Sequence, residues 1–76
     1  MEIKGFIEKF AEQFDETPAE LFTAGTKFRE LDEWSSIMAL SIIAMVDEEY
    51  NVTLKGDDIL NSQTIKDLFN VIVSKY

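Results

Sequence analysis

A chain of 76 residues is long enough for one small domain, and a hydrophobic content of 46% argues against intrinsic disorder. Its 7 basic and 15 acidic residues give a net charge of −8, which disfavours binding to nucleic acid or to anionic membrane surfaces. It contains neither cysteine nor histidine, which excludes disulfides, thiolate metal sites and the usual catalytic base.

The first ten residues, MEIKGFIEKF, mix charged with apolar side chains and do not resemble a signal peptide. No uninterrupted apolar run approaches the roughly 20 residues that a helix needs to cross a bilayer. We therefore expect a cytoplasmic protein without membrane insertion.

The chain opens with the pattern of an amphipathic helix. Its apolar residues follow the spacing i, i+3, i+4, i+7 and i+11, which places them on one face of a helix. They are Ile3, Phe6, Ile7, Phe10 and Phe14. Charged residues occupy most of the other positions, so we expect the apolar stripe to face a hydrophobic core.

A short helical turn is predicted next, because Thr17-Pro18-Ala19-Glu20 has the pattern of a capping box with proline at the first helical position. Gly25 and Thr26 prevent the turn from extending far. Residues 22–35 then form a long ordered loop, a feature that is uncommon in small domains and often functional. Three apolar side chains are expected to hold this loop against the helices: Phe28, Leu31 and Trp34.

The second long helix is expected to span Ser36 to Tyr50. Its inward stripe is predicted to be Ala39, Ile42, Ile43, Val46 and Tyr50. Further apolar residues lie outside that stripe: Ile37, Met38, Leu40, Ala44 and Met45. A helix with so much apolar surface is either buried on several sides or offers part of its surface to a partner.

Two further helices complete the predicted fold. Residues 51–54 are expected to form an extended connection, and residues 56–60 a single helical turn. Thr64 is predicted to cap the last helix, with Asp67 at the third helical position, where negative charge suits the helix dipole. The apolar stripe of this helix is predicted to be Ile65, Leu68, Phe69, Ile72 and Tyr76.

These elements predict an all-α fold: a small four-helix bundle with three long helices, one short helix and a long first loop. No linker, repeat or low-complexity tract divides the sequence. We therefore expect residues 1–76 to form a single domain.

The sequence argues against an enzyme. Catalysis by a serine nucleophile needs a base, and without histidine only lysine or a carboxylate could serve. Asp57 and Asp58 lack the alternating oxygen ligands of a calcium loop, and no glycine-rich phosphate loop is present. We therefore expect neither catalytic residues nor a metal site.

Two adjacent serines, Ser35 and Ser36, stand at the predicted start of the most apolar helix. A serine in this place can cap the helix through its hydroxyl oxygen. The surrounding segment from Glu30 to Leu54 contains six acidic residues and no basic one. The acids are Glu30, Asp32, Glu33, Asp47, Glu48 and Glu49. This charge would steer a basic enzyme toward a hydroxyl at the helix start.

The order of these features resembles the acyl carrier proteins and the related peptidyl carrier domains. Members of that family share an Asp-Ser-Leu signature, whose serine receives 4′-phosphopantetheine from coenzyme A. Here Ser35-Ser36-Ile37 lies in register with the signature, at the start of a helix that ends with Asp47-Glu48-Glu49-Tyr50. The resemblance covers essentially the whole chain, including the long loop with Phe28 and the last helix capped by Thr64.

The resemblance implies that Ser36 bears the phosphopantetheine arm, while Ser35 takes the place of the family's aspartate. That aspartate helps the transferase to dock, so its absence is a departure from the family pattern. Ser41 is a second departure, because many relatives carry an acid at this position. Asp32 and Glu33 keep negative charge near the serine that would be modified.

By this resemblance, the chain is a monomeric carrier that holds an acyl or aminoacyl group as a thioester and shuttles it between separate enzymes. Its partners would be a phosphopantetheinyl transferase, an acyl- or aminoacyl-activating ligase, and an acyltransferase or synthase. Fatty acid, polyketide and nonribosomal peptide biosynthesis all use carriers of this shape. The residues expected to bind these partners are Ile37, Leu40, Ala44, Asp47 and Glu48.

The alternative interpretation is an acidic helical adaptor, which would bind a basic protein partner through the same helix and carry no cofactor. Intact mass after co-expression with a broad-specificity phosphopantetheinyl transferase distinguishes the two, since only a carrier gains the mass of one arm.

Overall fold

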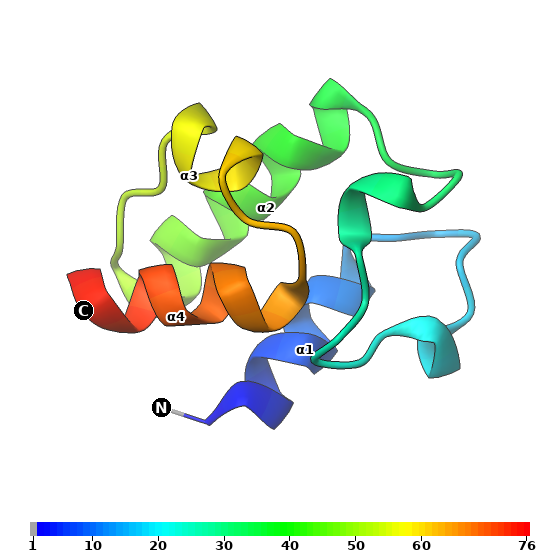
Figure 1. The fold of residues 1–76 in the computed structure, drawn as a ribbon, viewed down its shortest axis with the longest axis horizontal. Coiled ribbons are helices and arrows are strands. Elements are labelled where there is room, and N and C mark those ends of the chain that lie inside the picture. The colour runs from blue at the N-terminus through cyan, green and yellow to red at the C-terminus, as the bar shows by residue number, and fades with distance from the viewer. Residues whose placement is uncertain (1) are drawn as a thin grey trace.

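Four α-helices and two short 3₁₀ turns form the fold of residues 2–76, the part of the chain that the computed structural model describes (Figure 1). The helices are α1 (Ile3–Glu12), α2 (Ser36–Tyr50), α3 (Gly56–Leu60) and α4 (Ile65–Lys75). The 3₁₀ turns, η1 (Ala19–Leu21) and η2 (Phe28–Glu30), both lie in the long connection between α1 and α2. Residues 2–76 contain no strand, so the predicted all-α fold of four helices is confirmed.

Aromatic side chains from α1 and from the long connection form the centre of the core. Phe6 and Phe10 of α1 are completely buried, and their ring centroids lie 5.9 Å apart. The ring of Phe10 also lies 5.5 Å from that of Phe28 in η2. Helix α1 contacts both α2 and α4, which supply most of the remaining core. The completely buried aliphatic residues of these two helices are Ile42, Val46, Ile65, Leu68 and Ile72.

Helix α1 is shorter than its apolar stripe. It ends at Glu12, so Phe14 belongs to the connection that follows and not to a helical turn. Phe14 is nevertheless buried, because its ring packs 4.9 Å from that of Phe22. Ile3 and Ile7 are half-buried, so the completely buried residues of the stripe are Phe6 and Phe10.

The capping box predicted at Thr17–Glu20 is wrong. Pro18 occupies the position before η1, with φ −60° and ψ 140°, and no side chain of residues 2–76 caps this turn. The hydroxyl of Thr17 donates instead to the Glu33 carboxylate at 2.8 Å. Thr17 therefore forms its side-chain hydrogen bond with Glu33, which is distant in the sequence, and not with the first turn of η1.

The long connection is an ordered loop, as predicted, and it is anchored to the start of α4. The amide of Ile65 donates to the carbonyl of Thr26 at 3.1 Å. The guanidinium of Arg29 donates twice to the carbonyl of Ser62, at 3.1 and 3.3 Å. The three predicted apolar anchors also pack on the core: Phe28, Leu31 and Trp34.

Helix α2 has the predicted bounds, but its buried face differs from the predicted one. Ile42 and Val46 are completely buried, as expected. Met45, predicted to lie outside the inward stripe, is also buried, whereas Ala39 and Ile43 are only half-buried. The helix is apolar on most of its circumference, so its own periodicity does not determine which side faces the core.

Asn51 ends α2. Its backbone lies in the left-handed region, with φ 57° and ψ 38°, and its amide donates to the Asp47 carbonyl at 3.0 Å. Asparagine adopts this conformation more readily than most residues and often ends helices. The chain then runs extended to α3, as predicted, and buries Val52 and Leu54 on the way.

Helix α4 begins with the predicted cap. The Thr64 hydroxyl accepts a hydrogen bond from the amide of Asp67, and the Asp67 carboxylate accepts one from the amide of Thr64, both at 3.1 Å. Lys75 in the last turn lies 2.9 Å from the Asp58 carboxylate and so joins α4 to α3. The inward position predicted for Tyr76 is wrong: it follows the last helical residue and is 77% exposed, because the helix has ended before it can face the core.

None of the helices in residues 2–76 is long and apolar enough to span a membrane.

Candidate functional site

The first turn of α2 gives the two adjacent serines different roles. Ser35 precedes the helix in an extended conformation, with φ −156° and ψ 173°. Its hydroxyl oxygen accepts a hydrogen bond from the amide of Met38 at 3.3 Å, and its carbonyl accepts one from the amide of Ala39 at 3.0 Å. These two bonds define an N-cap residue. Of the two serines, Ser35 is therefore the one that caps the helix.

Ser36 is the first residue of α2 and is exposed. Its hydroxyl makes no hydrogen bond to any group in the described part of the chain. It stands at the positive end of a 15-residue helix, where unpaired amides and the helix dipole stabilise negative charge. A free hydroxyl in such a field is suited to carry a phosphate ester.

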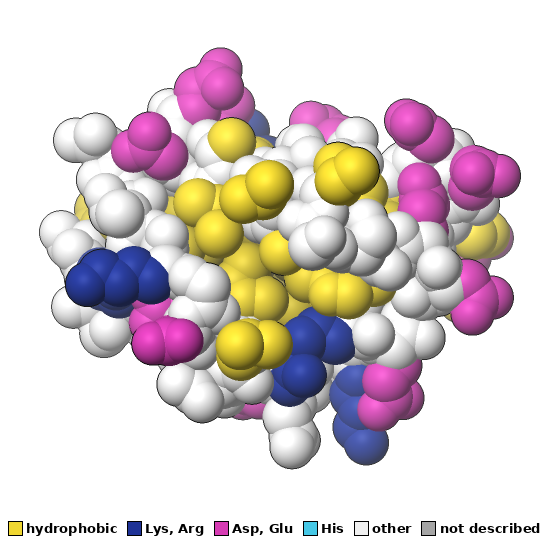
Figure 2. Space-filling view, turned by 90° about the horizontal axis from the view of Figure 1, so that it is seen from above, with side chains coloured by type: hydrophobic (Ala, Val, Ile, Leu, Met, Phe, Trp, Pro, Cys, Tyr) yellow, Lys and Arg dark blue, Asp and Glu magenta, His cyan; other side chains and the backbone are white. Residues whose placement is uncertain are grey.

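An exposed apolar stripe begins directly after Ser36. Ile37 is 72% exposed and Leu40 is 65% exposed. Ala44, one turn further along, is exposed as well. This spacing places all three on one face of α2. Figure 2 looks onto the side of the molecule that carries α2 and α3, and hydrophobic side chains gather across its middle. Such a surface is typical of a contact site.

Leu60, at the end of α3, is a further exposed apolar residue that the sequence analysis missed. It is 64% exposed, whereas its neighbour Ile59 is buried. No local pattern singles out Leu60, because two neighbouring apolar residues of a helix can both be buried, as Met45 and Val46 are in α2.

Acidic side chains continue the exposed stripe toward the end of α2. Asp47 and Glu48 are exposed, and neither forms an ion pair within residues 2–76. Glu49 instead lies 3.2 Å from the ammonium of Lys9 in α1. The hydrogen bond between Lys9 and the Glu49 carboxylate, together with the negative charge of Glu49, raises the pKa of Lys9. Asp47 and Glu48 are therefore available to a basic partner, while Glu49 connects two helices.

The Glu33 carboxylate near the start of α2 accepts four hydrogen bonds. Oε1 accepts from the hydroxyl and amide of Thr17, at 2.8 and 2.9 Å, and from the amide of Glu16 at 3.1 Å. Oε2 accepts from the amide of Asp15 at 2.8 Å. These bonds lower the pKa of Glu33, and the Thr17 hydroxyl makes the largest contribution.

From the sequence alone, Glu33 is expected only to supply negative charge near the serines. The structure shows that its carboxylate is directed toward the segment that follows α1. Its partner Thr17 lies 16 residues earlier in the chain. No local pattern reveals a contact at that separation.

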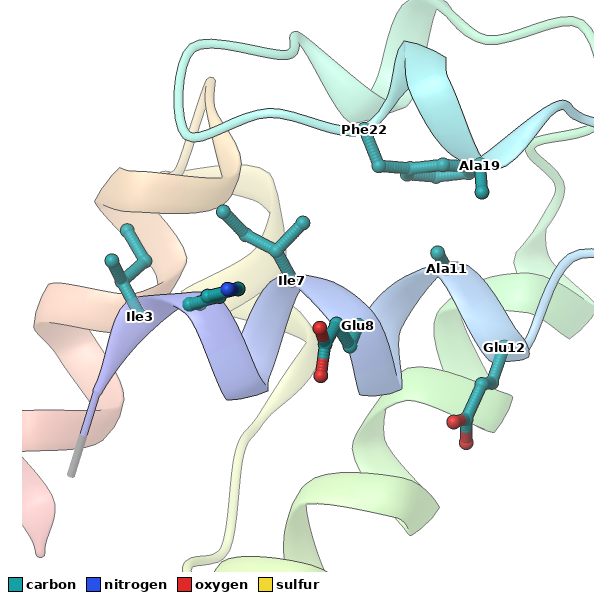
Figure 3. A pocket seen from close by; sticks show the side chains of 8 residues that line it. Ile3, Ile7, Glu8, Ala11, Glu12, Ala19 and Phe22 are labelled. Atoms are coloured by element: carbon teal, nitrogen blue, oxygen red, sulfur yellow. The ribbon is translucent and has the colours of Figure 1, made fainter.

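A separate open groove of about 550 Å³ lies between α1 and η1 (Figure 3). Ile7 points from α1 toward the turn, and Phe22 points from the connection toward α1. All of the residues that line the groove lie between positions 3 and 22, so it contains no part of α2. It is therefore distinct from the site at the two serines.

A more polar cleft of about 530 Å³ lies beside the Glu33 hydrogen bonds, and its lining includes Glu16, Glu30 and Asp32. Although the cleft is acidic, no group of three or more histidine, cysteine, aspartate or glutamate side chains in residues 2–76 is arranged to hold a metal ion.

Comparison with known families identifies the family of this chain. A family model described as a phosphopantetheine attachment site matches residues 4–72, which is well over half of the chain and includes both serines. Domains of this family carry a covalently attached 4′-phosphopantetheine. Comparisons with curated proteins and with solved structures gave no significant match.

Proposed function

The chain belongs to the acyl and peptidyl carrier family that bears phosphopantetheine, and we propose that Ser36 is the residue to which the arm is attached. The observation that supports this most directly is the exposed, unpaired hydroxyl of Ser36 at the first position of α2. Ser35 is the only other hydroxyl of this turn, and its oxygen is already used as the helix cap.

Attachment forms a phosphodiester between Ser36 Oγ and the phosphorus of coenzyme A nearest to the arm. The bond that breaks joins this phosphorus to the adenosine 3′,5′-bisphosphate part, which leaves as an anion. In this proposal the Ser36 proton passes to a base on the transferase, since the chain has no histidine and the nearby Glu33 carboxylate already accepts four hydrogen bonds. The dipole of α2 then stabilises the negative phosphodiester.

The arm, when bound, supplies the thiol that holds the cargo as a thioester. The chain itself provides an exposed attachment point and a surface that partners recognise. It catalyses no reaction and shuttles an acyl or aminoacyl group between enzymes that do.

The recognition surface in this proposal is the exposed stripe of α2. Ile37, Leu40 and Ala44 would contact an apolar patch on the partner, beside the arm. Asp47 and Glu48 would pair with basic residues at the rim. The net charge of −8 would accelerate encounter with such a basic surface. The partners are the transferase that modifies Ser36, the ligase that loads the cargo, and the acyltransferase or synthase that receives it.

Incubation with coenzyme A and a broad-specificity phosphopantetheinyl transferase tests the proposal. The intact mass should rise by one phosphopantetheine, and peptide mapping should place it on Ser36. The Ser36→Ala variant should gain nothing, while Ser35→Ala, the matched control, should still be modified. An arm found on Ser35, or retained in Ser36→Ala, would overturn the assignment. An unmodified wild-type chain would favour the adaptor function instead.

A further inference from the structure

The side chain of Glu33 joins the segment that enters α2 to the segment that leaves α1. Its carboxylate accepts four hydrogen bonds from residues 15–17, with donor–acceptor distances of 2.8 to 3.1 Å. We refer to this carboxylate and its donors in residues 15–17 as the Glu33 clamp. Hydrogen bonds to an ionised group are shorter and stronger than those between neutral groups. Four of them on one side chain therefore define a specific orientation.

The short segment between the Glu33 clamp and Ser36 is restrained by a backbone hydrogen bond and by aromatic contacts. The amide of Trp34 donates to the carbonyl of Leu31 at 3.0 Å and closes a turn around position 33. The ring of Trp34 packs 5.1 Å from that of Phe28 and 6.3 Å from that of Phe14. The chain is therefore held by polar contacts at position 33 and by apolar contacts at position 34, immediately before the two serines.

The contacts that form the aromatic core and the contact that caps α2 do not involve the Glu33 clamp. Phe10 packs directly on Phe14 and Phe28. The hydroxyl oxygen of Ser35 accepts a hydrogen bond from the amide of Met38, and no residue of the clamp takes part in this bond. Residues 15 and 16, which donate to the carboxylate, are exposed. The Glu33 clamp is thus an additional restraint on the loop that precedes Ser36.

We propose that Glu33 is a positioning residue for the modification of Ser36: it holds the loop in the conformation in which a transferase binds the serine hydroxyl. This inference rests on the proposed function of Ser36. Without the clamp, the loop samples other conformations, and only the competent fraction of molecules binds the transferase. The KM for the carrier rises in inverse proportion to that fraction. The kcat stays near its wild-type value, because Ser36 and the groups of the transferase are unchanged.

The Glu33→Gln variant tests the role of the clamp, since it keeps the size of the side chain and one acceptor oxygen but loses the charge and the second acceptor. Modification with coenzyme A and transferase is followed by intact mass at several carrier concentrations. If about one molecule in ten keeps the competent loop, KM rises about tenfold. A KM equal to that of the wild-type chain would overturn the inference.

Asp32→Asn is the matched control, because it removes the same charge from the adjacent residue, which is exposed and forms no hydrogen bond through its side chain within residues 2–76. It should raise KM much less than Glu33→Gln. An equal rise in both variants would mean that the transferase responds to charge alone, and it would overturn the positioning role.

Thr17→Val tests the same clamp by changing a hydrogen-bond donor in place of the acceptor. It removes the hydroxyl that donates to Glu33 and leaves the backbone donors in place. KM should rise less than in Glu33→Gln, and the double variant should raise KM by less than the product of the two single effects, because both changes act on one network. Additive effects would contradict this. The milder variant also keeps the test valid if Glu33→Gln folds poorly.

Amide hydrogen exchange in the unmodified chain provides a readout that needs no transferase. Glu33→Gln should accelerate exchange at Asp15, Glu16 and Thr17 and leave the buried turn at Ile42 unaffected. Equal exchange in the wild-type chain and the variant would overturn the clamp. A wild-type chain that never gains the arm would overturn the proposed function as well, whereas normal modification of both chains with equal KM would overturn only the inference.

Discussion

Ser35 and Ser36 have the same side chain, yet the hydroxyl of Ser35 caps α2 while that of Ser36 forms no hydrogen bond within residues 2–76. The difference lies in the backbone: Ser35 is extended and its oxygen meets the amide of Met38, whereas Ser36 is already helical. Serine and aspartate are comparable N-caps. The resemblance to the family implies that Ser35 takes the place of an aspartate, a change that would alter the charge beside the proposed attachment site and preserve the start of the helix.

We expect Ser35→Ala to lower the free energy of unfolding by about 1 kcal/mol, because the amide of Met38 loses its acceptor. Urea denaturation of the unmodified chain measures this. Ser36→Ala is the control, and it should cost clearly less, since the Ser36 hydroxyl has no partner within residues 2–76. A similar loss in the two variants would show that Ser35 is not the cap.

The lowered pKa of Glu33 makes the clamp sensitive to acid. A carboxyl whose pKa is lower in the folded than in the unfolded chain stabilises the fold above its ordinary pKa, here 4.5. That stabilisation is lost as the pH falls through the lower, folded-state pKa. An NMR titration should find the Glu33 pKa below the ordinary value. Thr17→Val should raise it toward that value, because the Thr17 hydroxyl makes the largest contribution. A pKa that is the same with and without this hydroxyl would contradict the hydrogen-bonding pattern.

Among the elements, α2 has to satisfy two demands at once. Its inner side buries Ile42 and Val46 against the other helices. Its outer side keeps Ile37 and Leu40 in contact with solvent. An ordinary surface helix would place polar residues on that outer side. Leaving these aliphatic side chains in water costs free energy. Under the proposed function, each partner enzyme would recover that free energy by covering them when it binds.

Truncation of α2 should distinguish these two sides. Ile42→Ala should lower the free energy of unfolding by about 2–5 kcal/mol, the range for a buried aliphatic residue. Ile43→Ala should cost less, because Ile43 is only half-buried. Leu40→Ala, at an exposed position of the same helix, should have little effect. Chemical denaturation of the three variants provides the comparison, and a reversed order for Ile42 and Leu40 would mean that the helix is rotated.

For the molecule as a whole, net charge of −8 on 76 residues is the dominant electrostatic feature. Two ion pairs within residues 2–76, between Lys9 and Glu49 and between Lys75 and Asp58, bring opposite charges together and leave the net charge unchanged. Most of the 15 acidic side chains therefore lack a cationic partner at short range. Self-repulsion of this kind favours expanded states.

We expect the Tm to rise between dilute buffer and about 0.15 M salt, because the Debye length falls to about 8 Å and repulsion between exposed acids is screened. Salt also weakens the two ion pairs, but these lie at the partly exposed surface, where an ion pair contributes little. Calorimetry at neutral pH measures the shift. A Tm that falls with added salt would show that the ion pairs outweigh the repulsion.

The sequence by itself determined the order of the four helices and the first turns of α2 and α4. Caps at Ser35 and Thr64 act over three residues, so the start of α2 and of α4 could be predicted from neighbours in the chain. The exposed hydroxyl of Ser36 followed from the same local geometry. The order of these elements also sufficed to recognise the carrier family, which the match over residues 4–72 confirmed.

Only the tertiary structure decided which side of α2 is buried and what Glu33 binds. Met45 faces the core because neighbouring helices cover that side, and a helix that is apolar on most sides has no periodicity strong enough to predict it. Glu33 meets Thr17 because the loop folds back onto the aromatic core and brings together residues that are 16 positions apart. Hydrogen bonds between distant segments depend on the path of the whole loop, and that path is set by packing.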